Sequence, residues 1–204
     1  GGSIRVQSGF GHGTSSGAIW IRTTNAGKEG VSGAINVSTG TSSKGSTGHF
    51  QVSTGDATGG KSGAIQFLVG SGDSGVGSEI IIKAGDTRDE KTGGFVSLSS
   101  GYSHASTSGS IYFRTSNAGK EGVSGSISVL TGTSSYGNTG DFNISTGAAS
   151  RGHGGNIGMY VGNGDIGNGG NVIISAGITT DKSSTGGEIF FRGGDGTNED
   201  KTDG

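Results

Sequence analysis

The chain has no proline and no cysteine among its 204 residues, and charged side chains make up only 15% of it. Without cysteine it has no disulfide framework, and without proline no strand loses a ladder hydrogen bond. A net charge of −2 provides no basic footprint for nucleic acid or for an acidic membrane. No apolar run approaches the ~20 residues of a membrane span. These absences argue against a disulfide-stapled, a nucleic-acid-binding and a membrane-inserted protein.

The residues of catalysis and metal binding are also sparse. The chain has four histidines, His12, His49, His104 and His153, and none has a histidine or cysteine partner at metal-ligand spacing. No nucleophile is accompanied by a base and an orienting acid. We therefore expect neither an enzyme nor a bound cofactor.

What the chain does have is a short phrase of the form G-x-I-x-V-x-T-G, repeated thirteen times. The phrases start at Gly2, Gly17, Gly33, Gly48, Gly63, Ser78, Gly94, Gly109, Gly125, Gly140, Gly155, Gly170 and Gly187. Their spacing is 15 or 16 residues, with one interval of 17. A fixed short period is typical of a chain built from stacked units, none of which can bury its apolar face alone.

The third and fifth residues of every phrase, called here the inner rows, are apolar at all 26 sites. This period of two is that of a strand with one buried face. The pattern predicts an all-β fold: a thin, single-domain β-solenoid of about 13 coils with 15–16 residues per coil. We expect glycines at the first and eighth positions to supply the backbone angles of the corners and to let opposite walls approach closely.

The phrases are themselves grouped into a longer repeat. The nine residues from Asn25 to Gly33 recur unchanged from Asn117 to Gly125, which is 92 residues later. Six coils therefore form one predicted module. Residues 2–16 would be the last coil of a preceding module, residues 17–108 the first full module and residues 109–204 the second, with 193–204 as a polar terminal turn or tail.

Apolar residues between and just after the inner rows form a candidate lateral interface, because recurring exposed apolar spots mark interfaces. They are Trp20, Leu68, Ile81, Tyr112, Leu130, Tyr160, Ile173 and Phe190. The alternative is that they are scattered surface residues or cover a turn. For the repeated pairs Lys28–Glu29 and Lys120–Glu121, and for Arg22 and Arg114, solvated corners are favoured over intersubunit ion pairs.

Two glycine-aspartate turns resemble calcium-binding nonapeptide repeats and make Asp73 and Asp165 candidate calcium ligands. They recur 92 residues apart instead of every nine, and ordinary Gly-Asp turn chemistry explains them equally well. No other metal ligand is predicted.

Two sequons place Asn36 and Asn143 as candidate N-glycosylation sites on the outward side of a strand. An ice-binding role is a further alternative, because Thr39, Thr54, Thr131 and Thr146 occupy one column. The parity of that column points it inward, and a broad outward threonine array is absent.

The strings SGAINVSTGTSSKGSTG and SGSISVLTGTSSYGNTG resemble the Gly/Ser/Thr-rich tandem repeats of extracellular or surface fibre proteins of microalgae and other aquatic protists. The resemblance spans the whole chain and implies a structural role outside the cell or at its surface.

Because no capping repeat is visible, we expect head-to-tail self-association into a stiff fibre, with lateral bundling and glycans on its surface. The alternatives are the stalk of an adhesin, the stalk of a viral or phage fibre, and an ice-binding protein.

Overall fold

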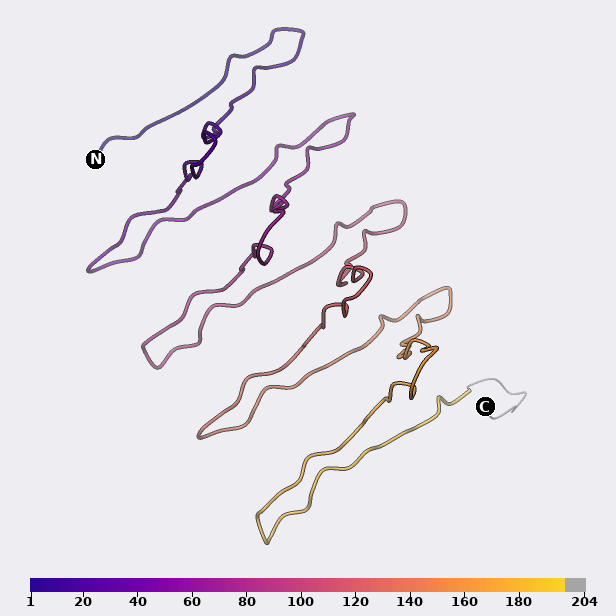
Figure 1. The fold of residues 1–204 in the computed structure, drawn as a ribbon. Coiled ribbons are helices and arrows are strands. Elements are labelled where there is room, and N and C mark those ends of the chain that lie inside the picture. Colours follow the sequence, from indigo (N-terminus) through magenta and orange to yellow (C-terminus); the bar gives the residue numbers. More distant parts are fainter. Residues whose placement is uncertain (197–204) are drawn as a thin grey trace. The chain divides into compact units, whose positions relative to one another are not determined.

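The computed structural model describes residues 1–196, and the chain divides into two units, Gly1–Leu98 and Ser99–Gly204. Within each unit, extended segments alternate with bends at which the chain changes direction (Figure 1). The described residues form no helix and no β-strand. None of them belongs to a helix long and apolar enough to cross a membrane. The predicted modules 17–108 and 109–204 rest on the sequence alone.

The predicted β-solenoid is wrong, because each phrase contributes one extended arm and one bend. The bends occupy residues 12–14, 28–29, 43–45, 58–60, 73–76, 88–91, 104–106, 120–121, 135–137, 150–152, 165–167 and 182–184. One bend therefore separates each phrase from the next. A coil that closes within 15–16 residues needs a second corner and a second short strand, and the described chain forms neither.

The described residues have no buried apolar core. The chain exposes 21741 Å², whereas a compact monomer of its mass exposes about 8,700 Å². The physical reason is that an alternating pattern specifies which face of a segment is apolar but does not specify its hydrogen-bonding partner. The predicted solenoid requires the next phrase of the same chain to be the hydrogen-bonding partner.

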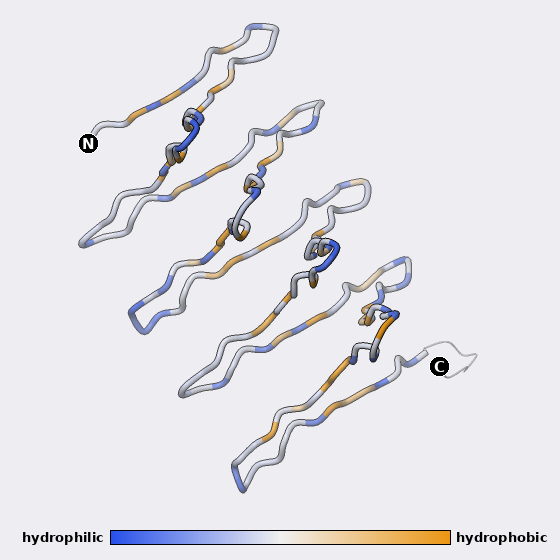
Figure 2. The backbone as a smooth tube through the Cα atoms, in the orientation of Figure 1, coloured by the Kyte–Doolittle hydropathy of each residue, from blue (hydrophilic) through white to orange (hydrophobic). Residues whose placement is uncertain are grey.

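The third position of the phrase is less exposed than the outer residues in most arms, whereas the fifth position is not consistently so. In the arm that begins at Gly63, the inner-row residue Ile65 is 47% exposed and the outer residue Leu68 is 84% exposed. In Figure 2 the hydrophobic positions recur along the extended segments of each unit. Each arm therefore presents apolar groups that its own unit does not cover.

The glycines with unusual backbone angles lie inside bends. Positive φ angles occur at Gly13, Gly59, Gly75 and Gly167, with values between 77° and 85°. Glycine adopts this region without the Cβ clash that other residues suffer. The first- and eighth-position glycines do not adopt it in the described chain, so this part of the corner prediction is wrong.

At four of the bends, glycines of these two columns instead meet and form what we call necks. The amide of a phrase-starting glycine donates to the carbonyl of the eighth-position glycine of the phrase before it. The four backbone bonds are Gly17 N to Gly9 O at 3.0 Å, Gly94 N to Gly85 O at 2.9 Å, Gly109 N to Gly101 O at 2.9 Å and Gly187 N to Gly177 O at 2.9 Å. A neck thus closes a loop containing the bend.

Small side chains line the necks. A Cβ atom on Gly94 would lie 3.2 Å from Gly85 N and 3.3 Å from Ala84 Cβ. A Cβ atom on Gly33 would lie 3.2 Å from Thr23 Cγ2, although no neck hydrogen bond accompanies that approach. Ala84 and Thr23 are among the few half-buried residues of the described chain. Close approach is therefore the reason for glycine at these phrase starts.

Candidate functional site

The eight candidate lateral-interface residues are all strongly exposed. Their exposed fractions run from 74% for Ile81 to 93% for Tyr160. Trp20, Leu68 and Ile81 belong to the first unit, and the other five residues belong to the second. Each is exposed enough to contact another molecule.

The sixth position of the phrase lies on the same face as the fourth and carries a basic residue in four phrases. In two of these the base is paired: Lys83 Nζ lies 2.7 Å from Asp86 Oδ2, and Arg192 Nη2 lies 2.7 Å from Asp195 Oδ2. In both, the aspartate is three residues after the base, at the ninth position of the phrase. Both pairs are exposed, so each contributes little to stability.

The other two bases have an asparagine where the aspartate would be. Asn25 lies three residues after Arg22, and Asn117 lies three residues after Arg114. Among the described residues neither arginine takes part in an ion pair. An amide cannot neutralise a guanidinium, so the charge of each arginine faces solvent.

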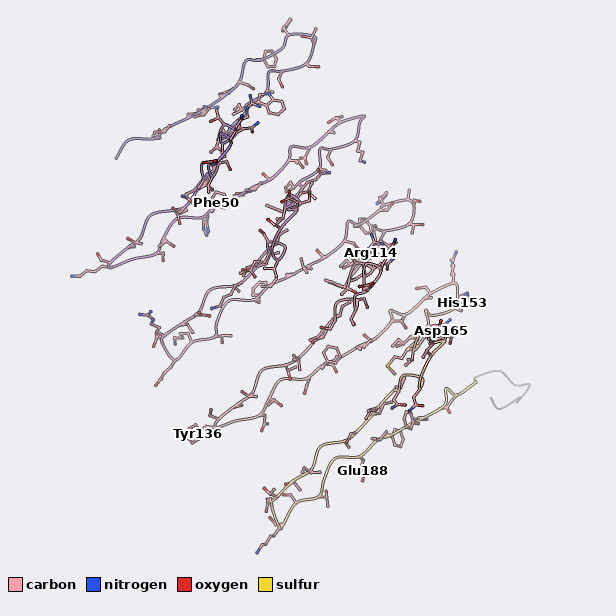
Figure 3. The ribbon with its side chains drawn as sticks, in the orientation of Figure 1. Phe50, Arg114, Tyr136, His153, Asp165 and Glu188 are labelled. Carbon is pink, nitrogen blue, oxygen red and sulfur yellow. The ribbon has the colours of Figure 1, made fainter. Side chains whose placement is uncertain are left out.

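Open hollows lie at both of these arginines. Arg22, Thr23, Thr24 and Asn25 line a hollow of about 410 Å³. The equivalent residues 114–117 line one of about 290 Å³, and Arg114 is labelled in Figure 3. A third hollow, of about 430 Å³, is lined by Trp20 together with Arg22. The two segments therefore combine a guanidinium, hydroxyl groups and an amide, and in the first an aromatic ring as well.

The candidate calcium ligands stand as single carboxylates. Asp73 and Asp165 begin bends that contain the positive-φ residues Gly75 and Gly167. In the part of the chain that the structure describes, no group of three or more histidine, cysteine or acidic residues lies together. Turn formation accounts for both aspartates.

A third aspartate organises its own bend. Asp181 Oδ1 accepts hydrogen bonds from the Ser183 amide at 3.0 Å and the Ser183 hydroxyl at 2.9 Å, and Oδ2 accepts one from the Ser184 hydroxyl at 2.8 Å. The Ser183 amide, followed by the two hydroxyls, lowers the pKa of this carboxyl below its ordinary value of 3.8. Hydrogen bonds to a carboxylate favour its charged form.

The remaining predicted sites are single exposed residues. Both sequon asparagines, Asn36 and Asn143, are exposed and accessible to modification. The threonine column contacts the chain itself in places: Thr146 Oγ1 donates to the Gly155 carbonyl at 3.2 Å. In Figure 3, Tyr136 lies at the tip of a bend and His153 beside another.

The sequence analysis does not distinguish the bases that pair with an aspartate, Lys83 and Arg192, from the two that do not in the described part of the chain. Considered one at a time, Arg22 and Arg114 are predicted to be solvated corners. The signal was the ninth position of the phrase, where aspartate accompanies Lys83 and Arg192 but asparagine accompanies the other two.

The chain matches no protein-family model, no curated protein and no solved structure, so its candidate sites are interpreted from their own residues.

Proposed function

We propose that this chain is a structural protein that associates with further copies of itself into an extracellular or cell-surface fibre. The observation that carries the proposal is the exposure of every inner-row side chain in the described part of the single chain. Burial of apolar surface is the main favourable term in folding and association, at roughly 25 cal/mol per Å². Rows that their own chain leaves exposed gain this term when other copies cover them.

The repeat supports self-association over binding to an unrelated partner. Two alternating rows at thirteen successive phrases give every copy the same spacing of apolar residues. A second copy therefore matches the first along its length, as in other assemblies of repeated units. The extended arms also carry backbone groups that are unpaired within the described chain, and such groups recruit further strands.

The outer face supplies a second candidate contact, for lateral bundling. Six of the eight outer apolar residues belong to it: Leu68, Ile81, Leu130, Tyr160, Ile173 and Phe190. Trp20 and Tyr112 differ from these six residues. An arginine lies two residues after each of them, and an asparagine lies three residues after that arginine.

Glycans fit an extracellular location. Asn36 and Asn143 are exposed sequon residues, so sugars attached to them would extend into solvent. A fibre outside the cell would carry such groups on surfaces left free by assembly.

The test compares two double variants that make the same substitution at the same 92-residue spacing. Val37→Ser with Val129→Ser changes an inner row, whereas Val31→Ser with Val123→Ser changes valines outside both rows. Val37 is 68% exposed and Val31 is 98% exposed, so neither change breaks a core in the single chain. Sedimentation over a concentration series gives the concentration at which fibres form, and electron microscopy shows them.

We expect the inner-row variant to raise that concentration at least tenfold, because covering a valine contributes about 1.5 kcal/mol or more per site. The second variant should change it less than twofold. Equal effects of the two variants, or an unmodified chain that stays monomeric at every concentration, would overturn the proposal.

A further inference from the structure

We infer that the segments 20–25 and 112–117 are two copies of a binding site for an acidic saccharide, meaning a sugar ring that carries a carboxylate or sulfate. Each contains an aromatic residue, an arginine two residues later, two hydroxyl-bearing residues and an asparagine. Hollows lie at both segments, lined by Arg22 to Asn25 in one and by Arg114 to Asn117 in the other.

The uncompensated charge is the first step of the argument. Four bases share the sixth position of the phrase, and an aspartate 2.7 Å away neutralises Lys83 and Arg192. At Arg22 and Arg114 that aspartate is replaced by asparagine. A guanidinium presents a planar fork of donors that matches a carboxylate or sulfate. The guanidinium donors of Arg22 and Arg114 can therefore bind an anion from another molecule.

The neighbouring groups indicate that the anion belongs to a sugar. Thr24 provides a hydroxyl and Asn25 an amide, and these groups both donate to and accept from the hydroxyls of a saccharide. Trp20 lines a hollow together with Arg22, so a flat apolar ring lies beside the charge. Such a ring can stack on the C–H face of a pyranose at low cost in conformational entropy.

Within the two copies three of six positions differ, and each change keeps the chemical class of the side chain. Thr24 becomes Ser116, which keeps the hydroxyl, and Ile21 becomes Phe113, which stays apolar. Trp20 becomes Tyr112, which keeps the aromatic ring. The chemistry of this segment is thus preserved through its substitutions.

A polymeric ligand suits two shallow sites on one chain. Each hollow is open, so a single sugar residue would bind weakly. A polysaccharide that reaches both sites, or sites on neighbouring copies, gains affinity because the second contact forms at a high effective concentration.

The experiment measures binding of the full chain, kept below the concentration at which it assembles, to a polyuronate such as pectate. Uncharged dextran and single-stranded DNA serve as comparison polymers. Arg22→Gln with Arg114→Gln removes the proposed forks, and Trp20→Ala with Tyr112→Ala removes the rings. Arg5→Gln with Arg88→Gln is the matched control, because it makes the same change in charge outside both sites.

We expect the site arginine variant to weaken pectate binding at least tenfold and the ring variant to weaken it at least fivefold, with less than a twofold effect of the control. Sulfated dextran distinguishes a sulfate from a carboxylate preference. Absence of binding to both pectate and sulfated dextran, equal losses in the two arginine variants, equal binding of dextran, or equal binding of DNA would each overturn the inference. Fibre formation by the site variants is measured separately, so this result does not depend on the proposed function.

Discussion

Single residues in this chain act mainly on the few residues beside them. Asp181 fixes the bend 182–184 by accepting three hydrogen bonds from two serines, all within three residues of it. The positive φ of Gly13 serves the bend 12–14 in the same local way. Since no described side chain packs into a core, a substitution at this scale changes a bend and leaves distant arms as they were.

The Asp181 carboxyl gives the first prediction. Its pKa lies below 3.8 in the bend, so the stabilisation is fully present above pH 3.8 and is lost as the pH falls through the lowered pKa. In a carbon-detected NMR titration of the carboxyl, Ser183→Ala with Ser184→Ala should move the midpoint upward. The rise should be partial, because the Ser183 amide remains as a donor. Identical midpoints in the two chains would contradict the hydrogen-bond arrangement.

At the scale of the arm and its bend, the sequence predicts much of what is found. The phrase boundaries anticipate where the chain bends. The alternation does not anticipate exposure along a whole arm, because Ile81 and Ile82 are both 74% exposed. Phrase-starting glycines such as Gly33 and Gly94 mark where two arms approach, because a Cβ there would crowd the neck, whereas nothing in the described chain lies within 4 Å of a Cβ at the eighth-position glycines. The pairing of Lys83 and Arg192 could also be foreseen from the aspartate three residues after each.

The neck gives a prediction with a built-in control. Gly94→Val places a branched side chain where even a Cβ lies 3.2 Å from Gly85 N, whereas nothing lies within 4 Å of a Cβ on Gly48. An exposed hydrogen bond contributes about 1 kcal/mol and so slows amide exchange about fivefold. Protection at position 94, corrected for the intrinsic rate, should disappear in Gly94→Val and persist in Gly48→Val. Loss of protection in both variants would show that the neck is not the cause.

For the molecule as a whole, the sequence could not reveal which surface covers the inner rows. Ile65 and Val37 show the apolar face expected of them, and a period of two is compatible with a partner in the same chain or in another. The predicted solenoid requires a covering partner in the same chain, whereas the structure leaves the inner rows exposed. The candidate arginine sites were missed for a related reason: Arg22 becomes distinctive only by comparison with equivalent positions in other phrases.

The exposure of the rows predicts the thermal behaviour of the dilute chain. Unfolding raises the heat capacity because it exposes apolar surface, and in the described residues that surface is exposed already. Scanning calorimetry of the dilute monomer should therefore show no cooperative transition, and assembled material should show one. A sharp transition in the monomer, with a heat-capacity rise near 12–15 cal/mol/K per residue, would contradict the open structure.

The short reach of the necks has a consequence for how such a chain evolves. Every neck hydrogen bond joins glycines only eight to ten residues apart, as in Gly9 with Gly17 and Gly177 with Gly187. Unequal recombination that removes or duplicates one phrase together with its bend would leave all other necks intact. The gene can thus gain or lose repeats without a folding penalty elsewhere, and populations should carry alleles of different length.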